Sequence, residues 1–197
     1  SNGITLAHSC PTGGIISGTS AIMMLDGWTW EKATLKAPAG LHINWPNMGA
    51  VRYRRYRVSE EDAAKRREET LKKLDSAFDE ARRYLLAKQA DTGSGIIQHN
   101  KDLRWEAMVP VLKKEIPVFM HAGEIRQIIS AVEWANRQNV KIVIVGGYDA
   151  WRVADLLKKY EIPVIYEGVN SLPRRRWEDF DTPFTAPLKM YEAGLKY

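Results

Sequence analysis

The second half of the chain alternates between short apolar runs and segments with helical spacing. Strands are predicted at residues 116–120, 141–147 and 162–168, with helices at residues 102–114 and 149–160 and a further helix after residue 124. That last helix carries Ile125, Ile128, Ile129 and Val132 on one face. The strands are apolar on both faces, which is typical of parallel strands covered by helices. This order predicts right-handed βαβ units.

The middle of the chain predicts one long helix over residues 59–88. Ser59 and Asp62 form a capping pattern at its start. Its apolar positions recur three and four residues apart, so they form one stripe that packs on the core: Leu71, Leu74, Phe78, Ala81 and Leu85.

The two ends of the chain give weaker patterns. Residues 3–9 predict a strand, residues 10–20 a loop rich in Gly, Pro and Ser, and residues 40–44 a short strand that contains His42. Residues 186–197 predict a helix that stops at Gly194 and is followed by the first residues of another strand. The loop at residues 10–20 is expected to pack over the mouth of the sheet.

Composition and charge narrow the class of protein. The chain has 197 residues, 45% of them hydrophobic and 27% charged, as expected for one globular domain. It has no apolar run of the ~20 residues that cross a membrane, so no membrane partner is expected. The net charge is +5, but basic and acidic residues alternate along the predicted helix, so nucleic acid is not expected as a partner either.

Two strands of almost identical sequence end on chemically active side chains. Residues 115–124 read EIPVFMHAGE and residues 161–169 read EIPVIYEGV, which places His121 and Glu167 at corresponding positions. In α/β folds the active site lies at the carboxyl ends of the strands. An imidazole there can bind a metal, and a carboxylate can bind a metal or act as a base. A structural role in hydrogen bonding is the alternative for both residues.

The remaining candidates are less specific. His8 lies near the end of a predicted strand, and Arg174 belongs to a basic loop that borders the mouth and can meet a substrate or form ion pairs. Gly146 and Gly147 allow a helix to start close to the sheet and could cradle a phosphate. The single cysteine, Cys10, excludes an intrachain disulfide and a zinc site built of cysteines. No two histidines have the spacing of a metal-binding pair.

Residues 2–44, 105–147, 150–169 and 172–197, taken together, resemble the amidohydrolase superfamily and within it the imidazolonepropionase-like metal-dependent hydrolases. The resemblance implies an α/β fold of the (β/α)8 TIM-barrel kind. It also implies hydrolysis of C–N bonds in cyclic amides or dipeptide-like substrates by a water bound to Zn²⁺ or Fe²⁺. It makes His121 a metal ligand and leaves Gly146 or Gly147 where the family often has another histidine.

The same resemblance implies that residues 1–197 are one incomplete catalytic barrel, from about the second strand to the start of the eighth. The family's H-x-H pair and its aspartate do not occur at matching positions. We therefore expect no bound metal and no activity in this chain alone, and a homo-oligomer formed through unpaired sheet edges. In the intact enzyme, Glu167, Arg174 and His8 are the candidates for binding a small-molecule substrate.

Two other functions fit the sequence. The chain can be a barrel-like module that binds or assembles without catalysis, in which case the missing ligands are real losses. It can also be a phosphate- or nucleotide-binding α/β protein that uses Gly146, Gly147 and the arginines at 174–176. The substrate, the metal and the cellular compartment are not fixed by the sequence.

Overall fold

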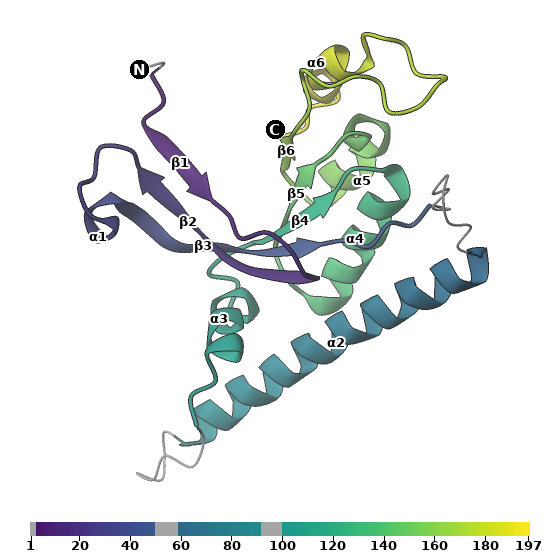
Figure 1. Cartoon of the computed structure of the whole chain (residues 1–197). Helices are drawn as coiled ribbons and strands as arrows, with labels where there is room; N and C mark the ends of the chain where they lie inside the picture. Colours follow the sequence, from purple (N-terminus) through teal and green to yellow (C-terminus); the bar gives the residue numbers. More distant parts are fainter. Residues whose placement is uncertain (1–2, 50–58, 92–99) are drawn as a thin grey trace.

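The computed structural model describes residues 3–49, 59–91 and 100–197, the last residue of the middle range by its backbone alone. The described chain is built on a curled six-stranded sheet in which the strands follow their order in the sequence, β1 to β6 (Figure 1). Helices pack on the outer face of its parallel part. This mixed α/β arrangement corresponds to half of a barrel.

The first three strands form an antiparallel meander. They are β1 (Leu6–Ser9), β2 (Ile16–Met24) and β3 (Thr34–Asn44), and the short helix α1 (Trp30–Ala33) joins the last two. The arrangement of parallel barrel strands that the resemblance implies is therefore not observed in this part of the chain. The loop predicted at residues 10–20 is also wrong in its second half, because residues 16–20 belong to β2 and pair with β3. The register shift between Ile16 and Gly18, where φ is +123° at Gly18, lets a glycine-containing segment join the sheet.

From β3 onward the sheet is parallel. The strands β4 (Val118–Ala122), β5 (Ile142–Gly146) and β6 (Val164–Tyr166) follow β3 side by side, as their apolar runs predict. Between them run α4 (Ile125–Gln138) and the pair η1 (Ala150–Val153) and α5 (Ala154–Lys159). The predicted βαβ units are confirmed here.

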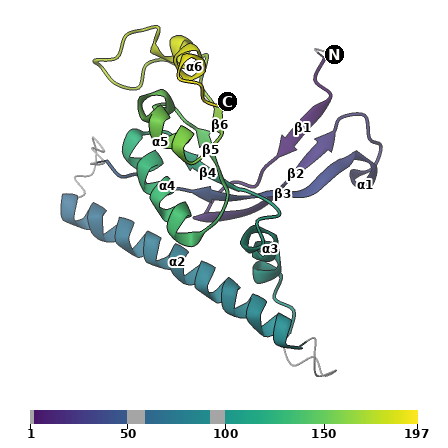
Figure 2. The ribbon, with the colours of Figure 1, turned by 180° about the vertical axis from the view of Figure 1, so that it is seen from behind.

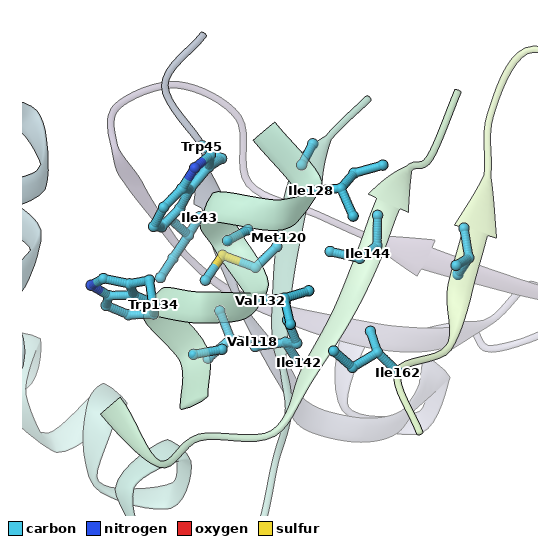
Figure 3. Close-up of a cluster of buried hydrophobic side chains, with 14 of the residues drawn as sticks. Ile43, Trp45, Val118, Met120, Ile128, Val132, Trp134, Ile142, Ile144 and Ile162 are labelled. Carbon is cyan, nitrogen blue, oxygen red and sulfur yellow. The ribbon is translucent and has the colours of Figure 1, made fainter. Parts of the chain in front are cut away.

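The core lies between these helices and one face of the parallel strands. Val118 and Met120 of β4 and Ile144 of β5 are fully buried against Ile128 and Val132 of α4, as Figure 3 shows. Trp134 of α4 packs on Trp45 and Phe78 at the side of this cluster. Since side chains alternate along a strand, the residues between these positions point to the opposite, inner face of the curled sheet.

The helix α2 (Glu60–Asp91) lies along the outside of α4 (Figure 2). Its amide at Asp62 donates to Oγ of Ser59 over 3.0 Å, so the predicted cap is present. Leu74, Phe78 and Ala81 of the predicted stripe are buried. After α2 comes α3 (Leu103–Leu112), which packs on α2 and β3. None of the helices in the described ranges is long and apolar enough to cross a membrane.

The last helix, α6 (Thr182–Glu192), is followed by Gly194 with φ +72°. The amide of Val164 in β6 then donates to the carbonyl of Lys196 over 2.9 Å. The final residues thus lie beside β6, as predicted, although they form no regular strand. The full eight-stranded barrel is not observed, because the described sheet has six strands and three of them are antiparallel.

Candidate functional site

The carboxyl ends of the parallel strands are joined by backbone hydrogen bonds. The amide of Trp45 donates to the carbonyl of His121 over 3.2 Å, that of Gly147 to Ala122 over 3.0 Å, and that of Glu167 to Gly146 over 3.2 Å. These bonds continue the ladder beyond the last paired residues. His121 and Glu167 therefore lie on one edge of the sheet, as the repeated strand sequence predicts.

His121 contacts a second histidine on the inner face of the sheet. In the parallel register β3 places His42 opposite Phe119, two residues before His121. Nδ1 of His42 lies 2.9 Å from Nε2 of His121, so one imidazole donates and the other accepts. His42 is 1% exposed, and its Nε2 is buried with no hydrogen-bond partner among the described residues. An unpaired buried nitrogen of this kind calls for an explanation.

His8 reaches the same place from the antiparallel part of the sheet. Its ring lies 5.5 Å from that of His42, and Phe119 stacks on His42 at 4.8 Å and contacts His8 at 5.1 Å. Nε2 of His8 is 2.8 Å from Oγ of Ser20, and this hydroxyl donates to the carbonyl of Gly40 over 3.3 Å. Since the hydroxyl has only one hydrogen, His8 donates from Nε2 and keeps its lone pair on Nδ1 when neutral.

Cys10 completes a cluster of possible metal ligands. One donor atom each of His8, Cys10 and His42 lies within 4.8 Å of the other two. His8 and Cys10 are exposed, whereas His42 is buried. Desolvation and, to a smaller degree, the charge of Glu167 raise the pKa of the Cys10 thiol. A thiol and two imidazoles are the ligand types that zinc takes.

Burial keeps the two bonded imidazoles neutral. Burial and the nearby rings of His121 and His8 lower the pKa of His42 to about 4. Burial also lowers the pKa of His121, although the carboxylate of Glu167 acts in the opposite direction. At neutral pH one nitrogen of the pair therefore has a free lone pair for a metal or a proton, either Nε2 of His42 or Nδ1 of His121, depending on which ring donates the shared hydrogen bond.

Arg174 lies at the rim of this edge. Its guanidinium is 4.7 Å from the ring centre of Tyr148, and a Cβ on Gly123 would come within 3.2 Å of its Nη1. The side chain is exposed, and the Gly123 that it approaches lies two residues after His121 in the sequence. A cation in this position can meet an anionic group of a substrate.

Arg175 has a structural role instead. Its Nη1 and Nη2 bind the carboxylate of Asp149 over 2.9 and 2.6 Å, and Nη1 also binds Glu178 over 2.7 Å. Asp149 is 1% exposed, and it accepts from the amide of Ile125 at the start of α4. The ion pairs expected in this basic loop are therefore present, and they hold the loop against the strand ends.

Gly147 also has a structural explanation. A Cβ there would lie 2.5 Å from Cγ1 of Val164, and φ is +51°. The backbone of Gly147 thus has to pass close to β6 where η1 begins. This confirms the packing interpretation of the glycine pair and leaves the phosphate interpretation without a structural observation of its own.

Sequence reasoning did not single out two members of the site. His42 lies between two apolar residues, Leu41 and Ile43, in a predicted strand. A histidine at such a position is the sequence feature that could have identified it as a candidate. Cys10 had been considered only for sites made of cysteines. The three histidines of the site come from three strands, so no spacing along the chain reports their proximity.

Comparison with known proteins gives a match to one type of fold. No protein-family model matches the chain, and no curated protein is significantly similar in sequence. A crystal structure titled as an amidohydrolase from Thermotoga maritima superposes with a TM-score of 0.80 at 23% identity. The alignment covers 98% of this chain and 49% of that one, so the chain spans about half the length of its structural neighbour. At this identity the likeness shows an amidohydrolase-like fold and nothing further.

Proposed function

We propose that the chain contributes the His121 edge of the active site to a metal-dependent hydrolase of the amidohydrolase kind, acting on C–N bonds of cyclic amides or dipeptide-like small molecules. The observation that carries the proposal is the imidazole pair, His42 with His121, at the carboxyl edge of an amidohydrolase-like half-barrel. Active sites of α/β barrels lie at this edge. We also propose that this hydrolase is of the imidazolonepropionase-like kind within the superfamily.

The residues at the edge fit a divalent metal in chemical type. His121 is neutral because burial lowers its pKa, and Glu167 provides a carboxylate whose charge acts on it. These two side chains would hold Zn²⁺ or Fe²⁺, with Nδ1 of His121 as the free nitrogen when Nε2 donates to His42. A catalytic zinc takes about three protein ligands, so the proposal requires at least one ligand besides these two. The metal would supply a bound water that loses its proton near neutral pH.

The roles of this chain's residues follow from their positions. His42 orients the ring of His121 through the 2.9 Å contact. Arg174, at Gly123 beyond β4, would bind an anionic group of the substrate, and Glu167 would accept a hydrogen bond from a substrate N–H. His8 would border the substrate beside Phe119 of β4, whose ring lies 5.1 Å from that of His8.

The direct test uses the protein with any flanking sequence of its gene. Metal content and amide hydrolysis are measured before and after His121→Ala, with Arg137→Ala in the last turn of α4 as a matched control. We expect the first variant to lose both and the second to keep both. Unchanged metal content and turnover in the His121 variant would remove this residue from the site, and absence of hydrolysis in the intact protein would favour a non-catalytic module.

A further inference from the structure

We propose that His8, Cys10 and His42 form a second metal site, which binds one Zn²⁺ per chain through one thiolate and two imidazoles. This site is distinct from the His121 edge and does not depend on the chain being a hydrolase. It lies where the antiparallel meander meets the parallel strands, since β1 supplies His8, Cys10 directly follows β1, and β3 supplies His42. We had expected no metal in this chain alone, so the proposal reverses that expectation.

The distances are close to those of a bound site. The three donor atoms lie within 4.8 Å of one another, whereas ligands at about 2.0–2.3 Å from a tetrahedral zinc lie roughly 3.3–3.8 Å apart. A contraction of about 1 Å would complete the site. The two exposed residues, His8 and Cys10, can make this movement, while His42 is held by the sheet and by the stacked ring of Phe119.

The unpartnered nitrogen of His42 is an independent observation in favour of a ligand. Nδ1 of His42 is engaged by His121, and Nε2 is buried without a partner among residues 3–49, 59–91 and 100–197. A buried polar atom of this kind destabilises the fold when it stays unsatisfied. Coordination of a metal by Nε2 would satisfy this nitrogen. A metal-bound imidazole also commonly donates its other N–H to a neighbouring group. His121 would then be that neighbour.

The second imidazole is also prepared for binding. Ser20 gives its hydroxyl hydrogen to the carbonyl of Gly40, so His8 donates from Nε2 and presents an unprotonated Nδ1. Both histidines thus have a partner on one nitrogen and a second nitrogen for the metal. Cys10 binds as a thiolate, so its S–H proton goes to solvent when the metal arrives. The soft sulfur ligand selects Zn²⁺ over hard cations such as Mg²⁺.

The hydrogen bond between the histidines makes the two metal sites compete. When His42 binds by Nε2, its Nδ1 is protonated and donates to Nε2 of His121, which leaves the hydrogen of His121 on Nδ1. When His121 binds by Nδ1, the reverse tautomers are required. Among the described residues the cluster has three ligands and the edge two, so a single ion goes to His8, Cys10 and His42.

The experiment is a titration of the 197-residue chain with Co²⁺, followed by displacement with Zn²⁺, under reducing conditions. We expect one Co²⁺ per chain, a sulfur-to-cobalt charge-transfer absorption, and release of a proton. Cys10→Ser removes the absorption and stoichiometric binding. His121→Gln keeps both but weakens binding about tenfold to a hundredfold, as loss of a partner behind a ligand does. Ser17→Ala, a change outside the ligand set, is the matched control and leaves the titration unchanged.

The opposite results are equally clear. Absence of binding, binding without the sulfur absorption, or unchanged binding in Cys10→Ser would overturn the site. Loss of binding in His121→Gln with retention in Cys10→Ser would assign the ion to the edge of the sheet, which supports the proposed hydrolase centre and overturns this one. Since Cys10 and His8 are exposed, both Cys10→Ser and a second variant, His8→Ala, are expected to fold, and circular dichroism checks this.

Discussion

His42 and His121, 79 residues apart in the sequence, face each other across β3 and β4 with Nδ1 and Nε2 separated by 2.9 Å. The contact joins the antiparallel and parallel parts of the sheet, because β3 belongs to both. It also couples the tautomers of the two rings, and therefore the two places where a metal can bind. Most of the chemistry that the chain offers depends on this pair.

The buried imidazole makes stability depend on pH. The pKa of His42 is lowered to about 4, whereas an unfolded histidine titrates near 6.5. As the pH falls below 6.5, this histidine is protonated in the unfolded chain, whereas in the folded chain it stays neutral down to about pH 4. The free energy of unfolding therefore decreases between pH 6.5 and pH 4. We expect about 2 kcal/mol less stability at pH 5 than at pH 7. Urea unfolding at both values with a chelator present measures it.

The control for this effect is His42→Gln, which removes the titrating group. Its free energy of unfolding should change less between pH 7 and pH 5 than that of the unaltered chain. A titration of the His42 ring by nuclear magnetic resonance with a midpoint near 6.5 would contradict the assignment, because it would mean that the imidazole is charged as easily in the fold as in water.

Removal of the buried carboxylate of Asp149 should destabilise the fold. Asp149→Asn weakens the bidentate pair with Arg175 and leaves that guanidinium, a quarter exposed, without its main anion. We expect a loss of about 3 kcal/mol in the free energy of unfolding, toward the lower end for a broken buried pair. Arg176→Ala, a neighbouring exposed arginine, should change it by less than about 0.5 kcal/mol. Equal effects of the two variants in thermal or urea unfolding would show that the pair has little structural weight.

Two glycine substitutions separate backbone strain from crowding. Gly147→Ala introduces both backbone strain and crowding, since φ is +51° and the new Cβ would lie 2.5 Å from Cγ1 of Val164. Gly13→Ala meets strain alone, because φ is +93° and nothing lies within 4 Å. We expect losses of about 1–2 kcal/mol for Gly13→Ala and about 2–4 kcal/mol for Gly147→Ala. If urea unfolding gives the same loss for both, the close approach of β5 and β6 is not tightly packed.

The edge strand β1 predicts self-association, in line with the homo-oligomer expected from the sequence. β1 pairs with β2 on one side, and Ile4 and Leu6 are 67% and 48% exposed beside it. Light scattering after size-exclusion chromatography should show a mass that rises with concentration. Leu6→Lys should lower it, because a charge on an edge strand opposes pairing. Leu86→Lys on the exposed side of α2 is the control, and a monomer at every concentration would refute the prediction.

The sequence by itself determined the elements whose evidence is local. The helical spacing of Ile125, Ile128 and Val132, the cap at Ser59 and the apolar strands before His121 and Glu167 predicted α4, α2, β4 and β6. Each of these patterns lies within a few turns of one helix or within one strand. Over that length the periodicity of the side chains alone indicates which face is buried. The shared edge of His121 and Glu167 followed from the rule that parallel strands end on the same side.

Only the tertiary structure decided the pairing of the first three strands and the composition of the site. Residues 16–20 have the composition of a loop but form part of β2, because pairing with β3 outweighs the local preference for a turn. His8, Cys10, His42 and His121 meet because strand register brings them together, and register is a relation between distant segments. A sequence pattern reports neighbours along one strand and not the partner across it, so the contact of His42 with His121 had to come from the fold.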